Sequence, residues 1–266
     1  MKRVMAIAVF AALQGCVAVR AEPGQATPVV DAYTASRLDG IFNRSRALRV
    51  AGESAVPASV VSTPLLGTPY KADTLVGSAN TSEQLVVDLR GLDCFTFLDN
   101  VEALRRADNY SDYVRELVRT RYAEGKVDFA HRHHFFSDWA QGHGARTRDI
   151  TPELGAVTQL SVKQLNAGTD GALLIQGLPT VSRVINYLPS ASVTQEALSR
   201  LQEGDYIGVY SMLPGLDVSH VGVFLRTAQG PVFRNASSRH GNMKVVDYPF
   251  NEFLQQVPGI VVLRPI

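Results

Sequence analysis

The chain has 266 residues, of which 45% are hydrophobic and 19% are charged. This ordinary globular composition excludes a disordered or coiled-coil protein. The formal net charge of +1 and the lack of any lysine or arginine run give no reason to expect nucleic-acid binding. The length fits one large domain or two small ones, and we expect a single domain over residues 33–266.

The N-terminus has the layout of a secretory signal over residues 1–21. Two basic residues precede an apolar run over 4–13, and small residues follow it. This run is too short for a membrane span, which needs about 20 apolar residues. We therefore expect cleavage after Ala21, a linker over 22–32, and a periplasmic or secreted protein with no membrane span.

A second interpretation of this leader stays open. Residues 13–16 (LQGC) resemble a lipobox, in which Cys16 would be lipidated and would anchor the protein. Under either interpretation Cys94 is the remaining cysteine of the chain, in a compartment where structural cysteines normally pair. Such a lone thiol indicates intermolecular pairing or reactivity, or else a small buried hydrophobic residue.

The first half of the chain predicts helices joined by loops. We expect a helix over 33–48, a loop with short extended pieces over 55–80, and a β-rich run over 84–89. Apolar residues then recur at helical spacing from Cys94, with Asp93 as N-cap. A further amphipathic helix is expected within 110–130, ending near Gly125.

The second half predicts mainly strands. Residues 150–200 show no assignable pattern. From 201 onward, turn residues separate short apolar runs, which lie at 206–212, 221–226, 232–237, 244–248 and 259–266. Helices followed by such strands indicate an α+β fold with an antiparallel sheet.

Three residues could carry nucleophilic chemistry. A helix N-terminus favours a thiolate at Cys94 and can lower a thiol pKa of about 8.5 by several units. Its free N–H groups can also face an oxyanion. His220, at a strand start, could act as the base, and Asn235, on the next strand, could orient it. Gly222 leaves room for another element to approach. Taken singly, His220 could be a surface histidine and Asn235 a turn residue, but the set has a sensible topology.

Seven sequence blocks resemble the NlpC/P60 superfamily of papain-like cell-wall hydrolases, and within it the N-acetylmuramoyl-L-alanine amidase-like family. The blocks span nearly the whole chain after residue 60: LGTPYKADTL (66–75), LDCFTFLDNVEAL (92–104), Arg121-Tyr122 with Gly125, HRHHFFSDW (131–139), EGD (203–205), GLDVSHVGVF (215–224) and NASS (235–238).

The resemblance implies an antiparallel sheet packed on the helix that carries Cys94. It also implies hydrolysis of a peptidoglycan amide bond through a thioester, with Cys94 as nucleophile, His220 as base and Asn235 as orienting group. One departure is that the residue at position 235 is often His in the wider superfamily. Asparagine can still accept a hydrogen bond from an imidazole N–H.

The block at 131–139 is expected to form a pocket wall. An arginine there could hold a carboxylate, and a tryptophan could face a sugar or a peptide. The alternative is a helix end with a polar face and an aromatic core anchor, and Asp93 could serve only as a helix cap. The predicted substrate-binding residues are Tyr70, Asp93, Arg132, His133, Ser137, Asp138 and Trp139.

We expect neither a metal nor another cofactor. His133 and His134 are adjacent and would point apart on a helix, and the chain has no HExxH spacing. The expected substrate is peptidoglycan or a muropeptide, cut at the N-acetylmuramoyl-L-alanine bond. Two alternatives stay open, an endopeptidase cutting between D-Glu and the diamino acid and an inactive cell-wall binding module. The oligomeric state stays open too.

Overall fold

A computed structural model describes residues 28, 30–49, 55–142, 144–155 and 157–266. The expected signal peptide, Cys16 and most of the expected linker lie outside these residues. No helix within the described ranges is long and apolar enough to cross a membrane.

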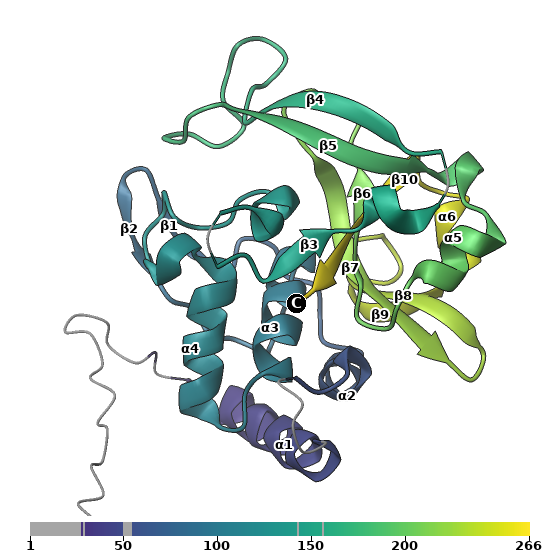
Figure 1. Cartoon of the computed structure of the whole chain (residues 1–266). Helices are drawn as coiled ribbons and strands as arrows, with labels where there is room; N and C mark the ends of the chain where they lie inside the picture. Colours follow the sequence, from purple (N-terminus) through teal and green to yellow (C-terminus); the bar gives the residue numbers. More distant parts are fainter. Residues whose placement is uncertain (1–27, 29, 50–54, 143, 156) are drawn as a thin grey trace, which may run out of the picture.

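Most of the helical residues belong to the N-terminal half of the chain and pack together on one side of the larger sheet (Figure 1). The α-helices are α1 (Ala32–Leu48), α2 (Ala58–Ser62), α3 (Cys94–Arg105), α4 (Tyr110–Arg121), α5 (Gln195–Arg200) and α6 (Phe250–Leu254). The 3-10 helices are η1 (Thr63–Leu65), η2 (Ala123–Gly125), η3 (Phe136–Ala140), η4 (Thr151–Leu154) and η5 (Ser190–Ser192).

The strands form a small hairpin and a larger sheet, both with antiparallel pairing. The hairpin pairs β1 (Val76–Ser78) with β2 (Thr81–Gln84). The larger sheet runs in the order β4-β5-β10-β6-β7-β8-β9, with β3 also paired to β10. Its strands are β3 (Thr147–Asp149), β4 (Gln159–Leu165), β5 (Val181–Pro189), β6 (Tyr206–Tyr210), β7 (Val218–Thr227), β8 (Gly230–Ser237), β9 (Lys244–Pro249) and β10 (Gly259–Pro265).

Two apolar clusters cover opposite faces of this sheet. Phe97 and Val101 of α3 belong to one cluster, together with Val221 and Val223 of β7. Phe224, the residue after Val223, faces the other side and belongs to the cluster that includes α6. The period-2 alternation of a strand and the helical spacing of α3 therefore bury the two elements against each other.

Several expected elements are confirmed. A helix occupies 32–48, and α3 begins at Cys94 with Asp93 as its N-cap. Strands β6 to β10 lie where the turn-separated apolar runs predicted them. The result is a mixed α/β protein with antiparallel sheets.

Other expectations are wrong or incomplete. The run over 84–89 forms no strand after Gln84. Its backbone instead bonds to side chains of helices, because Leu89 N–H donates to Thr34 Oγ1 and Val86 C=O accepts from Arg121. Residues 55–80 include helix α2 as well as loops.

Candidate active site

The first turn of α3 is fixed by a capping box. The Asp93 carboxylate accepts from Thr96 N–H at 2.7 Å, and Thr96 Oγ1 accepts from Asp93 N–H at 2.9 Å. Both residues satisfy helix-terminal groups that would otherwise be unpaired. Asp93 is therefore a helix cap, and Cys94 is the first helical residue after it.

Cys94 is a half-buried free thiol held among backbone N–H groups. The backbone N–H groups of Cys94, Phe95 and Val221 lie near its sulfur and favour the thiolate. Burial and the nearby Asp93 carboxylate oppose them, and together they raise the pKa of the Cys94 thiol to about 11. The expectation that the helix N-terminus lowers this pKa is wrong, because desolvation outweighs the N–H groups.

His220 and Asn235 lie on neighbouring strands and are joined directly. Arg234 pairs with Val223, which places Asn235 diagonally across from His220. The His220 Nε2 atom lies 2.9 Å from Asn235 Oδ1. An amide oxygen can only accept, so Nε2 carries the proton and Nδ1 has a free lone pair. Burial lowers the pKa of His220, and the bond to Asn235 opposes that shift.

The thiol and the imidazole meet at the start of β7. Val221, whose N–H reaches the Cys94 sulfur, directly follows His220. The Asp93 carboxylate acts on both groups and raises the pKa of each. No hydrogen bond joins Cys94 to His220 among the described residues, which is common for catalytic pairs before substrate binds.

Gly222 allows the ring of Phe233 to approach β7 closely. A Cβ at Gly222 would lie 2.5 Å from that ring, closer than packing permits. The Phe233 ring also contacts the His220 ring edge to face, with 6.1 Å between centroids. The glycine thus shapes one wall around His220, as its strand position predicted.

Tyr70 lies close to the thiol. Burial, Cys94 and Asp93 all raise the pKa of its hydroxyl. Its N–H donates to Met243 C=O at 2.9 Å, and its backbone pairs with Leu92, two residues before Cys94. Of the predicted substrate-binding residues, Tyr70 and Asp93 are therefore the two that the structure brings to Cys94.

Arg132 is occupied by a carboxylate of its own chain. Its Nε donates to Glu83 Oε1 at 3.0 Å, and a second guanidinium nitrogen pairs with the other oxygen. The Glu83 side chain is 1% exposed. This buried pair joins β2 to the segment after α4, so a predicted ligand-binding arginine holds a structural carboxylate instead.

Ser137 and Asp138 form a network with two residues that the sequence did not point to. Arg183 of β5 donates to Ser137 Oγ at 2.8 Å and to Asp138 at 3.1 Å. Asp217 accepts from Ser137 N–H at 2.7 Å. Asp217 lies within the block at 215–224, but Arg183 comes from the stretch that showed no assignable pattern.

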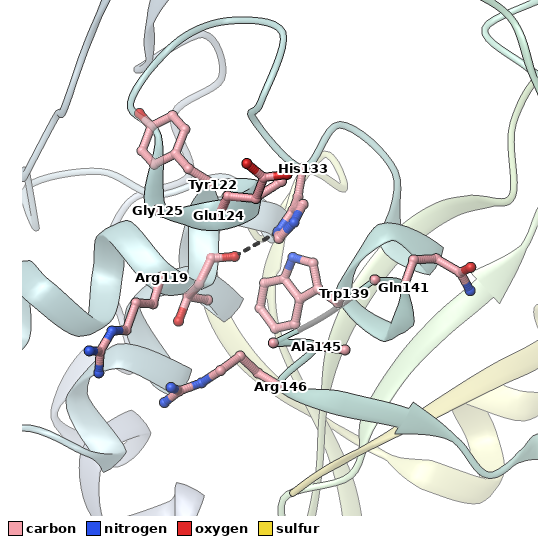
Figure 2. Close-up of a pocket in the computed structure, with 13 residues that line it drawn as sticks. Arg119, Tyr122, Glu124, Gly125, His133, Trp139, Gln141, Ala145 and Arg146 are labelled. Atoms are coloured by element: carbon pink, nitrogen blue, oxygen red, sulfur yellow. Dashed lines mark hydrogen bonds between the residues drawn. The ribbon is translucent and has the colours of Figure 1, made fainter.

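His133 and Trp139 border a cavity of about 810 Å³ (Figure 2). His133 Nδ1 lies 2.9 Å from Thr120 C=O. The Trp139 indole is 3% exposed and packs edge to face on Tyr206. Cys94, His220 and Asn235 do not line this cavity among the described residues.

A second cavity, of about 330 Å³, opens beside the imidazole. Its lining includes His220, Asn235, Ser237, Arg239 and Tyr248. The last three were not predicted as site residues.

Among the described residues, no group of three or more histidine, cysteine or acidic side chains could hold a metal ion.

Residues 60–260 match the AmiA-like family, described as N-acetylmuramoyl-L-alanine amidase-like. The chain belongs to this family. An N-acetylmuramoyl-L-alanine amidase from Bacteroides uniformis ATCC 8492 is similar to this family member at 25% identity and a TM-score of 0.63, over 77% of this chain and 96% of that one.

Two further solved structures are similar. A candidate xylanase from Bacteroides fragilis shares 27% identity with a TM-score of 0.62, over 76% of this chain and 98% of that one. A protein from Legionella pneumophila has the same fold at 19% identity and a TM-score of 0.63, over 88% of this chain and 93% of that one. No curated protein matches the chain. Membership of the amidase-like family supports a hydrolase that acts on peptidoglycan.

Proposed function

We propose that this amidase-like protein is a cysteine hydrolase that cleaves the N-acetylmuramoyl-L-alanine bond. The observation that carries the proposal is the 2.9 Å contact from His220 Nε2 to Asn235 Oδ1. This contact leaves His220 Nδ1 as a proton acceptor. The next residue, Val221, has an N–H group that lies near the Cys94 sulfur. Nucleophile, base and orienting group are thus supplied by three adjoining elements.

The proposed reaction has two halves. His220 Nδ1 takes the thiol proton while the Cys94 sulfur attacks the lactyl carbonyl carbon of the muramic acid. The C–N bond then breaks, and the imidazolium gives its proton to the leaving amino group of L-alanine. Water, deprotonated by the same ring, hydrolyses the resulting thioester and restores the thiol. The N–H groups of Cys94 and Phe95 are suited to hold the oxyanion in both halves.

The raised thiol pKa decides how the first step begins. With a pKa of about 11 for Cys94 and a lowered pKa for His220, both groups are neutral near pH 7. The resting site is therefore a thiol beside an imidazole, and proton transfer accompanies attack.

We also propose a papain-like NlpC/P60 arrangement, with export to the periplasm or beyond. The chain order cysteine, histidine, asparagine and the packing of α3 on the sheet support the first. The leader at 1–21 and a substrate that lies outside the cytoplasm support the second. N-terminal sequencing of the mature protein tests export: a start at Glu22 supports cleavage after Ala21, a modified Cys16 indicates a lipoprotein, and a retained Met1 contradicts both.

The direct test is mass spectrometry of the products from defined muropeptides. Wild-type protein is expected to release an intact stem peptide with a free L-alanine amino group. Cys94→Ala should release none, and a chelator should leave the wild-type rate unchanged, unlike an amidase that uses metal-activated water. Cleavage after D-Glu would identify the endopeptidase instead. Hydrolysis that survives alkylation of Cys94 but stops with a chelator would contradict the mechanism.

A further inference from the structure

The loop over 211–217 joins β6 to β7, the strand that carries His220. Burial does not hold the tip of this loop, because Met212 is 73% and Leu213 is 55% exposed. Hydrogen bonds from other elements hold it instead. Because the loop determines where β7 starts, these bonds bear on the position of His220.

The first anchor of the loop is Lys163 of β4, a strand at the edge of the sheet (Figure 1). Lys163 is 3% exposed. Its Nζ donates to Ser211 C=O at 2.7 Å and to Leu213 C=O at 2.9 Å, and it lies 4.7 Å from the centre of the Tyr210 ring. Among the described residues these bonds go to carbonyl oxygens rather than to a carboxylate. A buried ammonium is costly without acceptors, so the lysine and the two carbonyl groups hold each other in place.

Two more anchors hold the second part of the loop. Asn166, just after β4, donates its N–H to Gly215 C=O at 2.9 Å. Asp217 is 1% exposed, and its carboxyl group accepts from Val218 N–H and from Ser137 N–H, both at 2.7 Å. The end of β4 thus binds the loop at three carbonyl groups, and Asp217 fixes the last loop residue against η3.

Strand β7 begins with a bulge directly after this loop. Val218 and His220 pair with adjacent residues of β6, so Ser219 between them is an extra residue. Val218 and Val221 both belong to the apolar cluster on the α3 side. They are three positions apart, a spacing that an unbulged strand would place on opposite faces. A bulge re-aims the side chains beside it, and here the neighbouring side chain is His220.

We infer that Lys163 is a positioning residue for His220. The imidazole is held on one side by its bond to Asn235. On the other side, a shift of the strand start by one residue would remove the bulge and change the faces of the residues before Val221. Lys163 opposes this shift because it fixes the loop from which the strand starts. The role of His220 as base rests on the proposed function, whereas the anchoring of its strand does not.

Variants at position 163 test the inference in muropeptide hydrolysis. Lys163→Met keeps the length of the side chain and removes its donors. Its kcat should fall about 10- to 100-fold with KM changed by less than about twofold, because misplacing a catalytic group slows the reaction without removing substrate contacts. Lys163→Arg keeps a charged donor and should be faster than Lys163→Met by about threefold or more.

Arg264→Met is the matched control. Arg264 pairs at 2.7 Å with Asp205, whose side chain is 1% exposed and which directly precedes β6. This variant therefore breaks a buried anchor at the opposite end of β6 from the loop. Its melting temperature should fall, while kcat should stay within about twofold of the wild-type value.

Three kinetic outcomes would overturn the inference. They are an unchanged kcat in folded Lys163→Met, a loss confined to KM, and an equal loss of kcat in Arg264→Met. If Lys163→Met does not fold, Lys163→Gln takes its place, because it keeps an amide donor without the charge. An unchanged kcat in Lys163→Gln would count against the inference in the same way.

Amide hydrogen exchange separates this inference from the proposed function, because it needs no turnover. The backbone over 211–221 should exchange about tenfold faster in Lys163→Met than in the wild type or in Arg264→Met. Unchanged exchange would overturn the anchoring role of Lys163 whatever the activity. A wild-type protein that cuts no muropeptide would contradict the proposed function, and faster exchange in Lys163→Met would still support the anchoring.

Discussion

The start of β7 and the segment at 131–139 both gather histidine and polar side chains, but the structure uses them differently. At β7, the His220–Asn235 contact fixes one ring nitrogen and leaves the other free, beside a thiol. In the second region Arg132 is bonded to Glu83, and Asp138 to Arg183. The polar side chains of the first region keep groups that could take part in chemistry, whereas those of the second region hold segments of the chain together.

The difference lies in what remains unsatisfied after folding. A binding or catalytic group keeps a donor, acceptor or lone pair for the ligand, whereas a structural group uses all of its capacity within the chain. By this criterion His220 remains a candidate catalytic residue, whereas Arg132 does not remain a candidate ligand-binding residue. Five experiments test this distinction.

The largest effect is expected from removing the thiol or the base. Cys94→Ala and His220→Ala should each lower kcat/KM by about 10³-fold or more, and the double variant should be no worse than either, because the two act as a unit. Muropeptide hydrolysis measured beside a thermal melt checks this. Additive losses in the double variant would show that the two residues act separately.

Arg132→Ala should act on stability rather than on chemistry. It leaves the buried Glu83 carboxylate with the Tyr122 hydroxyl as a donor but without its charged partner, which costs about 3–5 kcal/mol of unfolding free energy. The double change Arg132→Gln with Glu83→Gln should recover part of that loss, because no charge is left buried. Denaturant unfolding measures both. A stable Arg132→Ala protein with a raised KM would instead make Arg132 a substrate-binding residue.

Asn235→Ala should have an intermediate effect on turnover. The imidazole loses its orienting acceptor but keeps its ability to take a proton, so kcat should fall about 10- to 100-fold, far less than with Cys94→Ala. Asn235→Asp restores an acceptor and serves as the comparison. A loss equal to that of Cys94→Ala, in a folded protein, would give Asn235 a larger role.

Alkylation tests the thiol pKa in the free protein. Only the thiolate reacts with iodoacetamide, and burial raises the pKa of Cys94 to about 11. The alkylation rate should therefore rise about tenfold per pH unit from pH 7 to 10 without reaching a plateau. A plateau below pH 8 would mean that a preformed thiolate exists in the resting protein.

The smallest expected effect is a shift of the acid limb of kcat/KM. Burial lowers the pKa of His220 below its ordinary value of 6.5, and the neutral ring is the base. Activity should therefore persist as pH falls through 6.5 and decline only below it. The same shift contributes stability that is present above pH 6.5 and is lost as pH falls through the folded pKa. In the wild-type protein the hydrogen bond to Asn235 raises the pKa of His220. In Asn235→Ala this bond is absent, so the acid limb of kcat/KM should move to still lower pH.

The elements that depend on local patterns can be predicted from the amino-acid sequence. Asp93 before an apolar helical run predicted both the cap and the position of Cys94, because capping and amphipathic spacing act within a few residues. Apolar runs between turns predicted strands β6 to β10, and the positions of His220 and Asn235 on adjacent strands followed. The amidase-like resemblance likewise rests on local blocks.

The remaining features depend on contacts between distant segments. Arg132 finds Glu83 and Ser137 finds Arg183 across 49 and 46 residues of sequence, and no local pattern shows such pairings. The thiol pKa is likewise set by burial under distant segments, which outweighs the local effect of the helix terminus. Hydrogen-bond partners and desolvation depend on which segments meet in space, so they separate the reactive groups from the structural ones only after folding.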